Sequence, residues 1–82
     1  MEAQTKQRLI AAISSVFDRF NPDQFSEELM LGDIPDWDSM NGINLQMAVE
    51  SEFSVELKDA SLAGTDRVAD ILRLLRGQGV AV

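Results

Sequence analysis

The sequence predicts a small all-α protein, a four-helix bundle of three main helices and one short helix, with a long loop between the first and second helices. Three observations lead to this prediction. Apolar residues recur at helical spacing in three segments, prolines and glycines separate these segments, and 82 residues suffice for one small domain. We therefore expect a single domain over residues 1–82, in which residues 78–82 form a loosely held tail.

The first helix is predicted from about Ala3 to Phe20. One buried face is indicated by apolar residues at spacings of four, seven, eight and eleven: Leu9, Ile13, Val16, Phe17 and Phe20. Asn21-Pro22 should end this helix, because proline disfavours helical geometry in the residue before it.

A long connection then leads to Trp37, with Gly32 and Pro35 as breakers. It also contains four apolar residues, which should anchor it against the helices: Leu29, Met30, Leu31 and Ile34. We therefore expect a packed connection.

The second helix should begin at Ser39, with Asp38 as its N-cap, and run to about Phe53. Residues 54–57 indicate an extended or irregular stretch, and Lys58 to Leu62 a short helical piece at most.

Gly64 separates this piece from the last helix, for which Thr65 is the expected cap. The predicted apolar face of the last helix consists of Val68, Ile71, Leu72 and Leu75. Gly77 should stop this helix in the left-handed conformation favoured after a C-terminus.

The second helix carries two apolar stripes. At about 100 degrees per residue, Leu45, Val49 and Phe53 share one side, whereas Met40, Ile43 and Met47 cluster on nearly the opposite side. One stripe can face the core, so the other is exposed, lines a cavity or meets a partner. Two methionines suit variable apolar ligands. An alternative is that the connection covers this stripe through Leu29, Leu31 or Ile34.

Charge is unevenly distributed along the chain. Between Phe20 and Leu57 there are nine acidic residues and no lysine or arginine, whereas elsewhere five acidic residues accompany seven basic ones. This acidic middle disfavours nucleic-acid binding and favours partners with basic patches, although a solvated face that maintains solubility is the alternative.

Composition excludes several kinds of chemistry. The chain has no cysteine, hence no disulfide or thiolate, and no histidine, so metal ligands would be mostly oxygens, and we expect no metal site. Ser39 lacks a histidine partner, and the only lysines, Lys6 and Lys58, lie in no recognisable nucleophile setting, so we expect no enzyme activity.

The longest apolar run, Leu9 to Ile13, is far shorter than the roughly 20 residues that span a bilayer. We therefore expect no membrane insertion. Lys6 and Arg8 precede an apolar stretch, as basic residues do in a signal sequence. Asp18 and Arg19, however, follow where the small residues of a cleavage site would lie. We therefore expect this segment to be part of the folded domain of a cytoplasmic protein.

The stretch from Asp38 to Phe53, DSMNGINLQMAVESEF, resembles the modification site and second helix of acyl carrier proteins. Those proteins typically read Asp-Ser-Leu, then hydrophobic residues at matching spacing, then an acidic pair before phenylalanine. The similarity is ungapped over these sixteen residues. Chain length, acidity and helix order extend it over nearly the whole sequence.

The resemblance implies that a phosphopantetheinyl transferase attaches 4'-phosphopantetheine to Ser39, with Asp38 capping the helix and contributing to transferase recognition. It further implies a monomeric carrier of thioester-bound acyl groups in lipid metabolism or a secondary-metabolite pathway. Partner enzymes that transfer or activate acyl groups would bind the Met40, Ile43 and Met47 stripe, and their basic patches would be attracted by acidic residues: Asp36, Glu50 and Glu52.

Asn41 and Asn44 depart from the family pattern, because carriers of fatty acid biosynthesis commonly have acidic residues there. Trp37 before the motif resembles carriers of dedicated pathways. We therefore expect a specialised carrier that enzymes of fatty-acid synthesis bind poorly.

Two alternatives remain, and a third fails. An aminoacyl or peptidyl carrier shares the arm, and an unmodified acidic helical adaptor would bind basic peptides through the second stripe. Calcium binding is suggested by Asp36 and Asp38, but the sixth position of such a loop is Asn41 and the twelfth is Met47, which do not fit.

Overall fold

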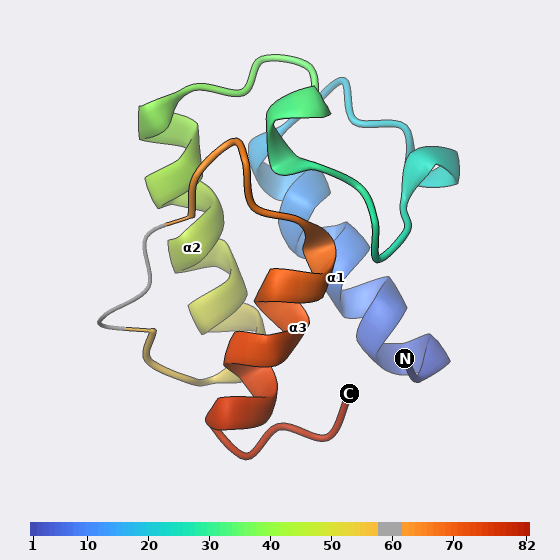
Figure 1. Cartoon of the computed structure of the whole chain (residues 1–82), viewed down its shortest axis with the longest axis vertical. Helices are drawn as coiled ribbons and strands as arrows, with labels where there is room; N and C mark the ends of the chain where they lie inside the picture. The colour runs from blue at the N-terminus through green and yellow to red at the C-terminus, as the bar shows by residue number, and fades with distance from the viewer. Residues whose placement is uncertain (58–61) are drawn as a thin grey trace.

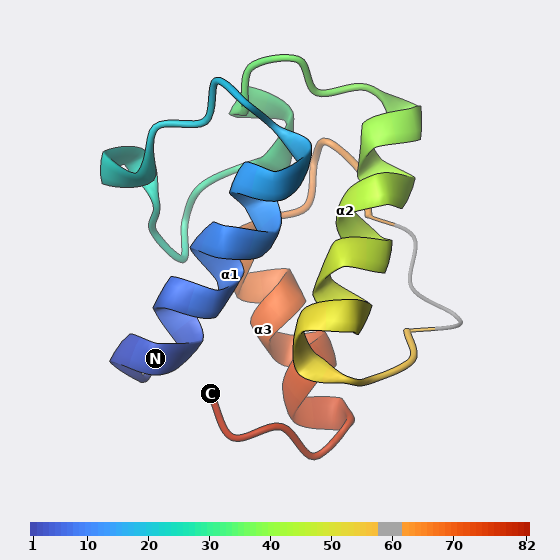
Figure 2. The same cartoon turned by 180° about the vertical axis from the view of Figure 1, so that it is seen from behind.

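The computed structural model describes residues 1–57 and 62–82. Within these residues the protein is all-helical and contains no strand. The main helices are α1 (Ala3–Val16), α2 (Ser39–Phe53) and α3 (Val68–Gly77). Figures 1 and 2 show α1 and α2 packed side by side, with α3 on one face of this pair and the connection between α1 and α2 crossing one end of the bundle. The predicted fold class is therefore confirmed at the level of an all-α domain.

The predicted fourth helix falls mostly outside the described residues. Lys58 to Ser61 are not described, and Leu62 lies in an irregular stretch. The four-helix arrangement is therefore not confirmed. In place of an unbroken loop, the connection between α1 and α2 includes two short 3-10 helices, Pro22–Gln24 and Leu31–Asp33.

One core joins the three helices and the connection. Leu9 and Ile13 of α1, Leu45 of α2 and Ile71 of α3 are completely buried in it. All four predicted apolar residues of α3 are buried, as are Leu31 and Ile34 from the connection. The expected packing of the connection against the helices is thus confirmed.

The predicted end of the first helix is wrong by one turn. The helix stops at Val16, and Phe17 has extended backbone angles, φ −114° and ψ 95°. Phe17 and Phe20 are nevertheless both buried, at 1% and 7% exposed. Leaving the helix lets both rings enter the core, so tertiary packing prevails over helical continuation here.

The predicted start of the last helix is also wrong. The N-cap is Arg67, whose N–H donates to the carboxylate of Asp70 at 2.8 Å, and Thr65 lies outside the helix. Before α3 the chain pairs with the connection: the N–H of Leu31 donates to the carbonyl oxygen of Asp66, and the N–H of Val68 donates to that of Leu29. These non-local hydrogen bonds hold Arg67, which pairs with Met30, in an extended conformation, so the helix begins only at Val68.

The glycine that ends the last helix is Gly79, and the prediction of Gly77 is wrong. Gly77 is the last helical residue, whereas Gly79 has φ +85°. The N–H of Gly79 donates to the Arg76 carbonyl and that of Val80 to the Leu75 carbonyl, both at 3.0 Å. This is the pattern of a Schellman motif, which satisfies the last helical carbonyl groups.

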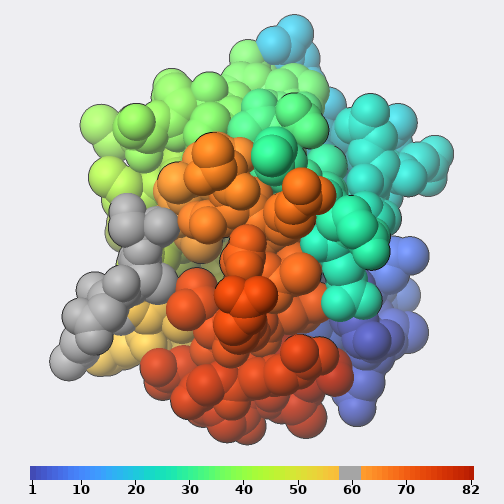
Figure 3. All heavy atoms as spheres, viewed as in Figure 1, coloured from blue at the N-terminus to red at the C-terminus, as the bar shows by residue number. Residues whose placement is uncertain are grey.

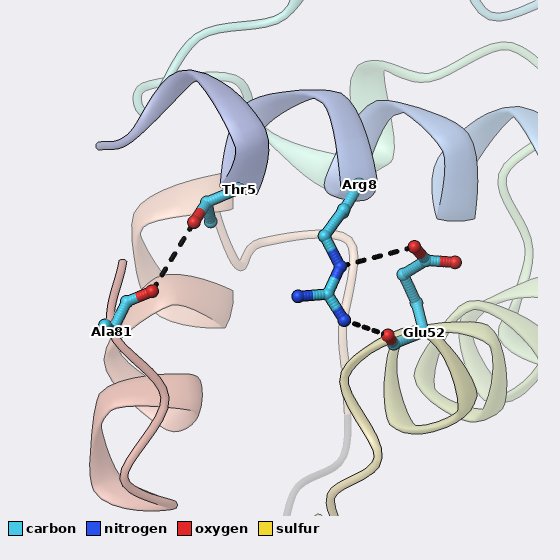
Figure 4. A network of polar contacts seen from close by, with 4 residues as sticks. All are labelled: Thr5, Arg8, Glu52 and Ala81. Carbon is cyan, nitrogen blue, oxygen red and sulfur yellow. Dashed lines mark hydrogen bonds and ion pairs between the residues drawn. The ribbon is translucent and has the colours of Figure 1, made fainter.

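The C-terminal residues run back along α1, and α1 is also tied to the end of α2 (Figure 4). The hydroxyl of Thr5 donates to the carbonyl oxygen of Ala81 at 3.5 Å. Arg8 donates to both the carboxylate and the carbonyl oxygen of Glu52. These contacts fix the end of the bundle that lies away from Ser39 (Figure 1).

Candidate functional site

Ser39 is the first residue of α2 and is exposed. The helix begins here because Asp38 caps it: the Asp38 carboxylate accepts from the N–H of Asn41 at 2.7 Å, and its carbonyl oxygen accepts from that of Gly42 at 3.0 Å. The predicted N-cap and the predicted bounds of this helix are confirmed. The cap fixes the backbone of the first turn, which places Ser39 on the surface.

Two backbone N–H groups beside the hydroxyl are open. Within the described part of the chain, the N–H groups of Ser39 and Met40 donate no hydrogen bond. Unpaired N–H groups at a helix N-terminus carry partial positive charge and bind anionic oxygen atoms such as those of phosphate. The first turn of α2 therefore offers a favourable place for a phosphate on the Ser39 oxygen.

Ser39 has no activating partner among the residues that the structure describes, because its hydroxyl makes no hydrogen bond there. A nucleophilic serine needs a base within hydrogen-bonding reach.

The second apolar stripe of α2 is exposed. Met40, Ile43 and Met47 are 66%, 57% and 60% exposed, while Leu45 and Val49 on the opposite side are completely buried. The alternative that the connection covers this stripe is wrong, because Leu31 and Ile34 point into the core and are themselves buried. Viewed down the helix axis, the exposed stripe lies on the same side of α2 as Ser39.

Asp36 is held by Arg19 in a two-point ion pair, with distances of 2.6 and 2.9 Å between guanidinium nitrogens and carboxylate oxygens. This hydrogen bonding holds the pKa of the Asp36 carboxyl below its usual value. Asp36 also has φ +71°, which is rare for a residue other than glycine. The turn before Ser39 is therefore fixed by a long-range contact.

Asn41 and Asn44 extend this network along α2. The side-chain amide of Asn41 donates to the Asp36 carbonyl oxygen at 3.0 Å, and that of Asn44 donates to the Asn41 side-chain oxygen at 3.3 Å. The two asparagines are thus part of the structure that supports the turn before Ser39.

The remaining two predicted partner-binding acids also have contacts inside the protein. Glu50 accepts the N–H of Leu57 at 2.8 Å, and Glu52 pairs with Arg8 at 3.4 Å. The structure therefore places Asp36, Glu50 and Glu52 where each carries an intramolecular bond, and it does not gather them into one unpaired acidic patch. Of the residues predicted to bind a partner, only those of the exposed stripe, Met40, Ile43 and Met47, are not engaged in contacts that support the fold.

Sequence reasoning missed a cluster of three glycines around Trp37. Methyl groups placed on Gly42 and Gly64 would each lie 3.1 Å from the indole, and one placed on Gly32 would lie 2.9 Å from the Gly64 carbonyl oxygen. Trp37 also stacks on Phe17 at 5.8 Å between ring centroids. No pattern of neighbouring residues in the sequence predicts that Gly42 and Gly64 contact Trp37 or that Gly32 contacts Gly64.

Within residues 1–57 and 62–82, no group of three acidic side chains is placed to hold a metal ion. In the same residues, no helix is long and apolar enough to cross a membrane.

Nothing matches this chain among the protein-family models, curated proteins and solved structures with which it was compared. Any function therefore has to be argued from the residues themselves.

Proposed function

We propose that this protein is a carrier of acyl groups, held as thioesters on a 4'-phosphopantetheine arm attached to Ser39. The observation that carries the proposal is the setting of Ser39: an exposed hydroxyl at the capped start of α2, beside two open N–H groups and an exposed apolar stripe. The resemblance of Asp38 to Phe53 to the carrier motif supports the same role.

The residues present fit such a group. Asp38 fixes the first turn, and the open N–H groups of Ser39 and Met40 can receive the phosphate oxygens of the arm. The arm supplies the thiol for thioester chemistry, which the chain's own side chains lack. No base is needed on this chain, because a transferase would provide the metal ion and the base.

The attachment step is a phosphoryl transfer. The Ser39 oxygen forms a bond to the phosphorus that bears the pantetheine in coenzyme A, and the pyrophosphate bond breaks. Adenosine 3',5'-bisphosphate leaves, and a base of the transferase takes the hydroxyl proton. The chain contributes the accessible oxygen, on a first helical turn whose backbone is fixed by Asp38.

The carrier is proposed to serve a dedicated lipid or secondary-metabolite pathway. Enzymes of fatty-acid synthesis that recognise acidic side chains at the start of this helix would meet Asn41 and Asn44, whose amide groups are engaged with each other and with the Asp36 backbone. Partners would instead bind mainly through Met40, Ile43 and Met47.

The test is incubation with coenzyme A, Mg²⁺ and a phosphopantetheinyl transferase of broad specificity, followed by intact-mass measurement. The wild type should gain the mass of one arm, and Ser39→Ala should gain none. Ser51→Ala is the matched control, because Ser51 is exposed on the same helix and should not affect the gain. An unchanged wild-type mass, or an arm on Ser39→Ala, would contradict the proposal.

An aminoacyl or peptidyl carrier would give the same result in that experiment. The intact mass of the protein purified from its native source distinguishes the two, because it weighs the arm together with any attached group.

The exposed stripe also favours a second function, that of an unmodified adaptor for amphipathic basic peptides. This function predicts no arm in the experiment above. It further predicts that a labelled basic amphipathic peptide binds the wild type and that Met47→Asp abolishes the binding.

A further inference from the structure

A tight turn lies directly before the start of α2. The N–H of Trp37 donates to the carbonyl oxygen of Ile34 at 3.1 Å, and Pro35 and Asp36 occupy the two central positions. Asp36 has φ +71°, whereas the ring of proline restricts φ to negative values. This combination is the pattern of a type II β-turn, in which glycine is the preferred residue at the position of Asp36. An aspartate there has an unfavourable backbone conformation, which persists only where other contacts support it.

Two contacts support Asp36 in this conformation. Its carboxylate accepts two hydrogen bonds from the guanidinium of Arg19, at 2.6 and 2.9 Å, and its carbonyl oxygen accepts one from the side-chain amide of Asn41 at 3.0 Å. Arg19 follows α1 in the sequence, whereas Asn41 belongs to the first turn of α2. Figure 3 shows light-blue atoms that follow α1 lying against green atoms of the segment before α2, at the top of the molecule. Asp36 therefore links the end of α1 to the start of α2.

Asn41 also connects the turn with the helix cap. Its backbone N–H donates to the carboxylate of Asp38 at 2.7 Å, while its side-chain amide donates to the Asp36 carbonyl oxygen. One residue of the first helical turn thus binds the chain on both sides of Trp37, and Ser39 follows immediately after the cap. The direction in which the chain enters α2 therefore depends on the conformation of Asp36.

We propose that Asp36 is a positioning residue for attachment of the arm, held by Arg19 and Asn41 in the left-handed turn that presents Ser39 to the transferase. The inference rests on the proposed function. It gives Asp36 a role in the backbone conformation before Ser39, in place of the predicted attraction of basic patches, because its carboxylate is already paired with Arg19. Opening of the turn lowers the fraction of the protein that the transferase can bind, so it raises the apparent KM for this protein and leaves kcat unchanged.

Asp36→Ala and Asp36→Gly separate the effect of the turn from that of the charge, because both variants lose the carboxylate. Glycine adopts positive φ freely, whereas the left-handed conformation is disfavoured for alanine by about five- to thirtyfold. The measurement is the kinetics of arm attachment by a phosphopantetheinyl transferase of broad specificity, with coenzyme A and Mg²⁺. Asp36→Ala should raise KM by about fivefold or more, whereas Asp36→Gly should stay within about twofold of the wild type. The kcat should be unchanged in both variants.

Asp33 provides the matched control, because it is an exposed acidic residue of the same connection without a positive φ. Asp33→Ala and Asp33→Gly should therefore have equal KM values. Thermal unfolding is measured for every variant, and the kinetics are recorded below the lowest midpoint, so that all proteins are folded. Equal KM values for Asp36→Ala and Asp36→Gly, whether raised or unchanged, would overturn the proposal.

Arg19→Ala tests the support of the turn. An exposed ion pair changes an equilibrium constant by up to about fivefold, so KM should rise by about two- to fivefold. Arg73→Ala removes a similarly exposed arginine, which pairs with Asp70 of α3 at 3.0 Å, and should leave KM unchanged. An unchanged KM for Arg19→Ala would overturn the part assigned to Arg19. A wild type that gains no arm would instead contradict the proposed function, so the two failures are distinguishable.

Discussion

Arg8 of α1 lies over the ring of Phe53 at the end of α2, with its guanidinium carbon 4.2 Å from the ring centroid. The same guanidinium donates to the carboxylate and carbonyl oxygens of Glu52 (Figure 4). One side chain thus combines a cation–π contact with a hydrogen bond to a carbonyl at the C-terminal end of a helix.

Arg8→Ala should lower the free energy of unfolding by about 1 kcal/mol, from the loss of the cation–π contact and of a hydrogen bond to the end of α2. Urea denaturation measures this. Lys6→Ala is the control, because Lys6 is exposed on the same helix and its side chain makes no hydrogen bond or ion pair with the described residues. Equal losses for both variants would show that the Arg8 contacts contribute nothing.

Gly42→Ala and Gly77→Ala should have opposite effects although both glycines are helical. A methyl group on Gly42 meets the Leu62 carbonyl oxygen and the Trp37 ring, so overpacking should cost about 1–3 kcal/mol. A methyl group on Gly77 meets nothing within 4 Å, so the higher helix propensity of alanine should stabilise by up to about 1 kcal/mol. Unfolding curves of the pair check this, and stabilisation by Gly42→Ala would contradict the close packing.

The ion pair between Arg19 and Asp36 should make part of the stability depend on pH. Arg19 lowers the pKa of Asp36 in the folded state, so the contribution is present above the unfolded-state pKa, near 4, and is lost as the pH falls through the folded-state value. Wild type should therefore unfold at a higher temperature than Asp36→Asn at pH 7, and this difference should shrink below about pH 4.

Asparagine is the appropriate replacement for Asp36, because it tolerates the left-handed backbone found there. A difference in unfolding temperature that stays constant down to pH 2 would mean that the carboxylate charge is not the source of the effect.

The two stripes of α2 should respond differently to truncation. Leu45→Ala removes a completely buried side chain and should cost about 2–5 kcal/mol. Met47→Ala changes a side chain that is 60% exposed and should alter the unfolding free energy by no more than about 0.5 kcal/mol. A large loss from Met47→Ala would indicate that this side chain is needed for folding.

Local signals were sufficient to predict α2. Its cap at Asp38, its end at Phe53 and its two stripes follow from residues close together in sequence, and the structure agrees at each point. The apolar face of α3 was predicted for the same reason.

Features that depend on distant residues were not predictable. α1 ends early because Phe17 turns into the core beside Trp37, and α3 begins late because the chain before it pairs with residues 29–31. The sequence identified Asp36, Glu50 and Glu52 as acidic residues but not their partners inside the protein. These partners are Arg19 for Asp36, the Leu57 N–H for Glu50 and Arg8 for Glu52. For the candidate site, the sequence predicted an accessible serine at a helix start, and only the three-dimensional packing showed that Trp37 meets Gly42 and Gly64.

The contact between Thr5 and Ala81 brings the two termini together at one end of the bundle, while α2 begins at the other end (Figures 1 and 2). A tag, a surface linker or a fused enzyme attached at either terminus would therefore point away from Ser39. Immobilising the protein by its termini should leave the Ser39 end facing the solution, which makes this chain suitable for surface-based binding measurements with large partner enzymes.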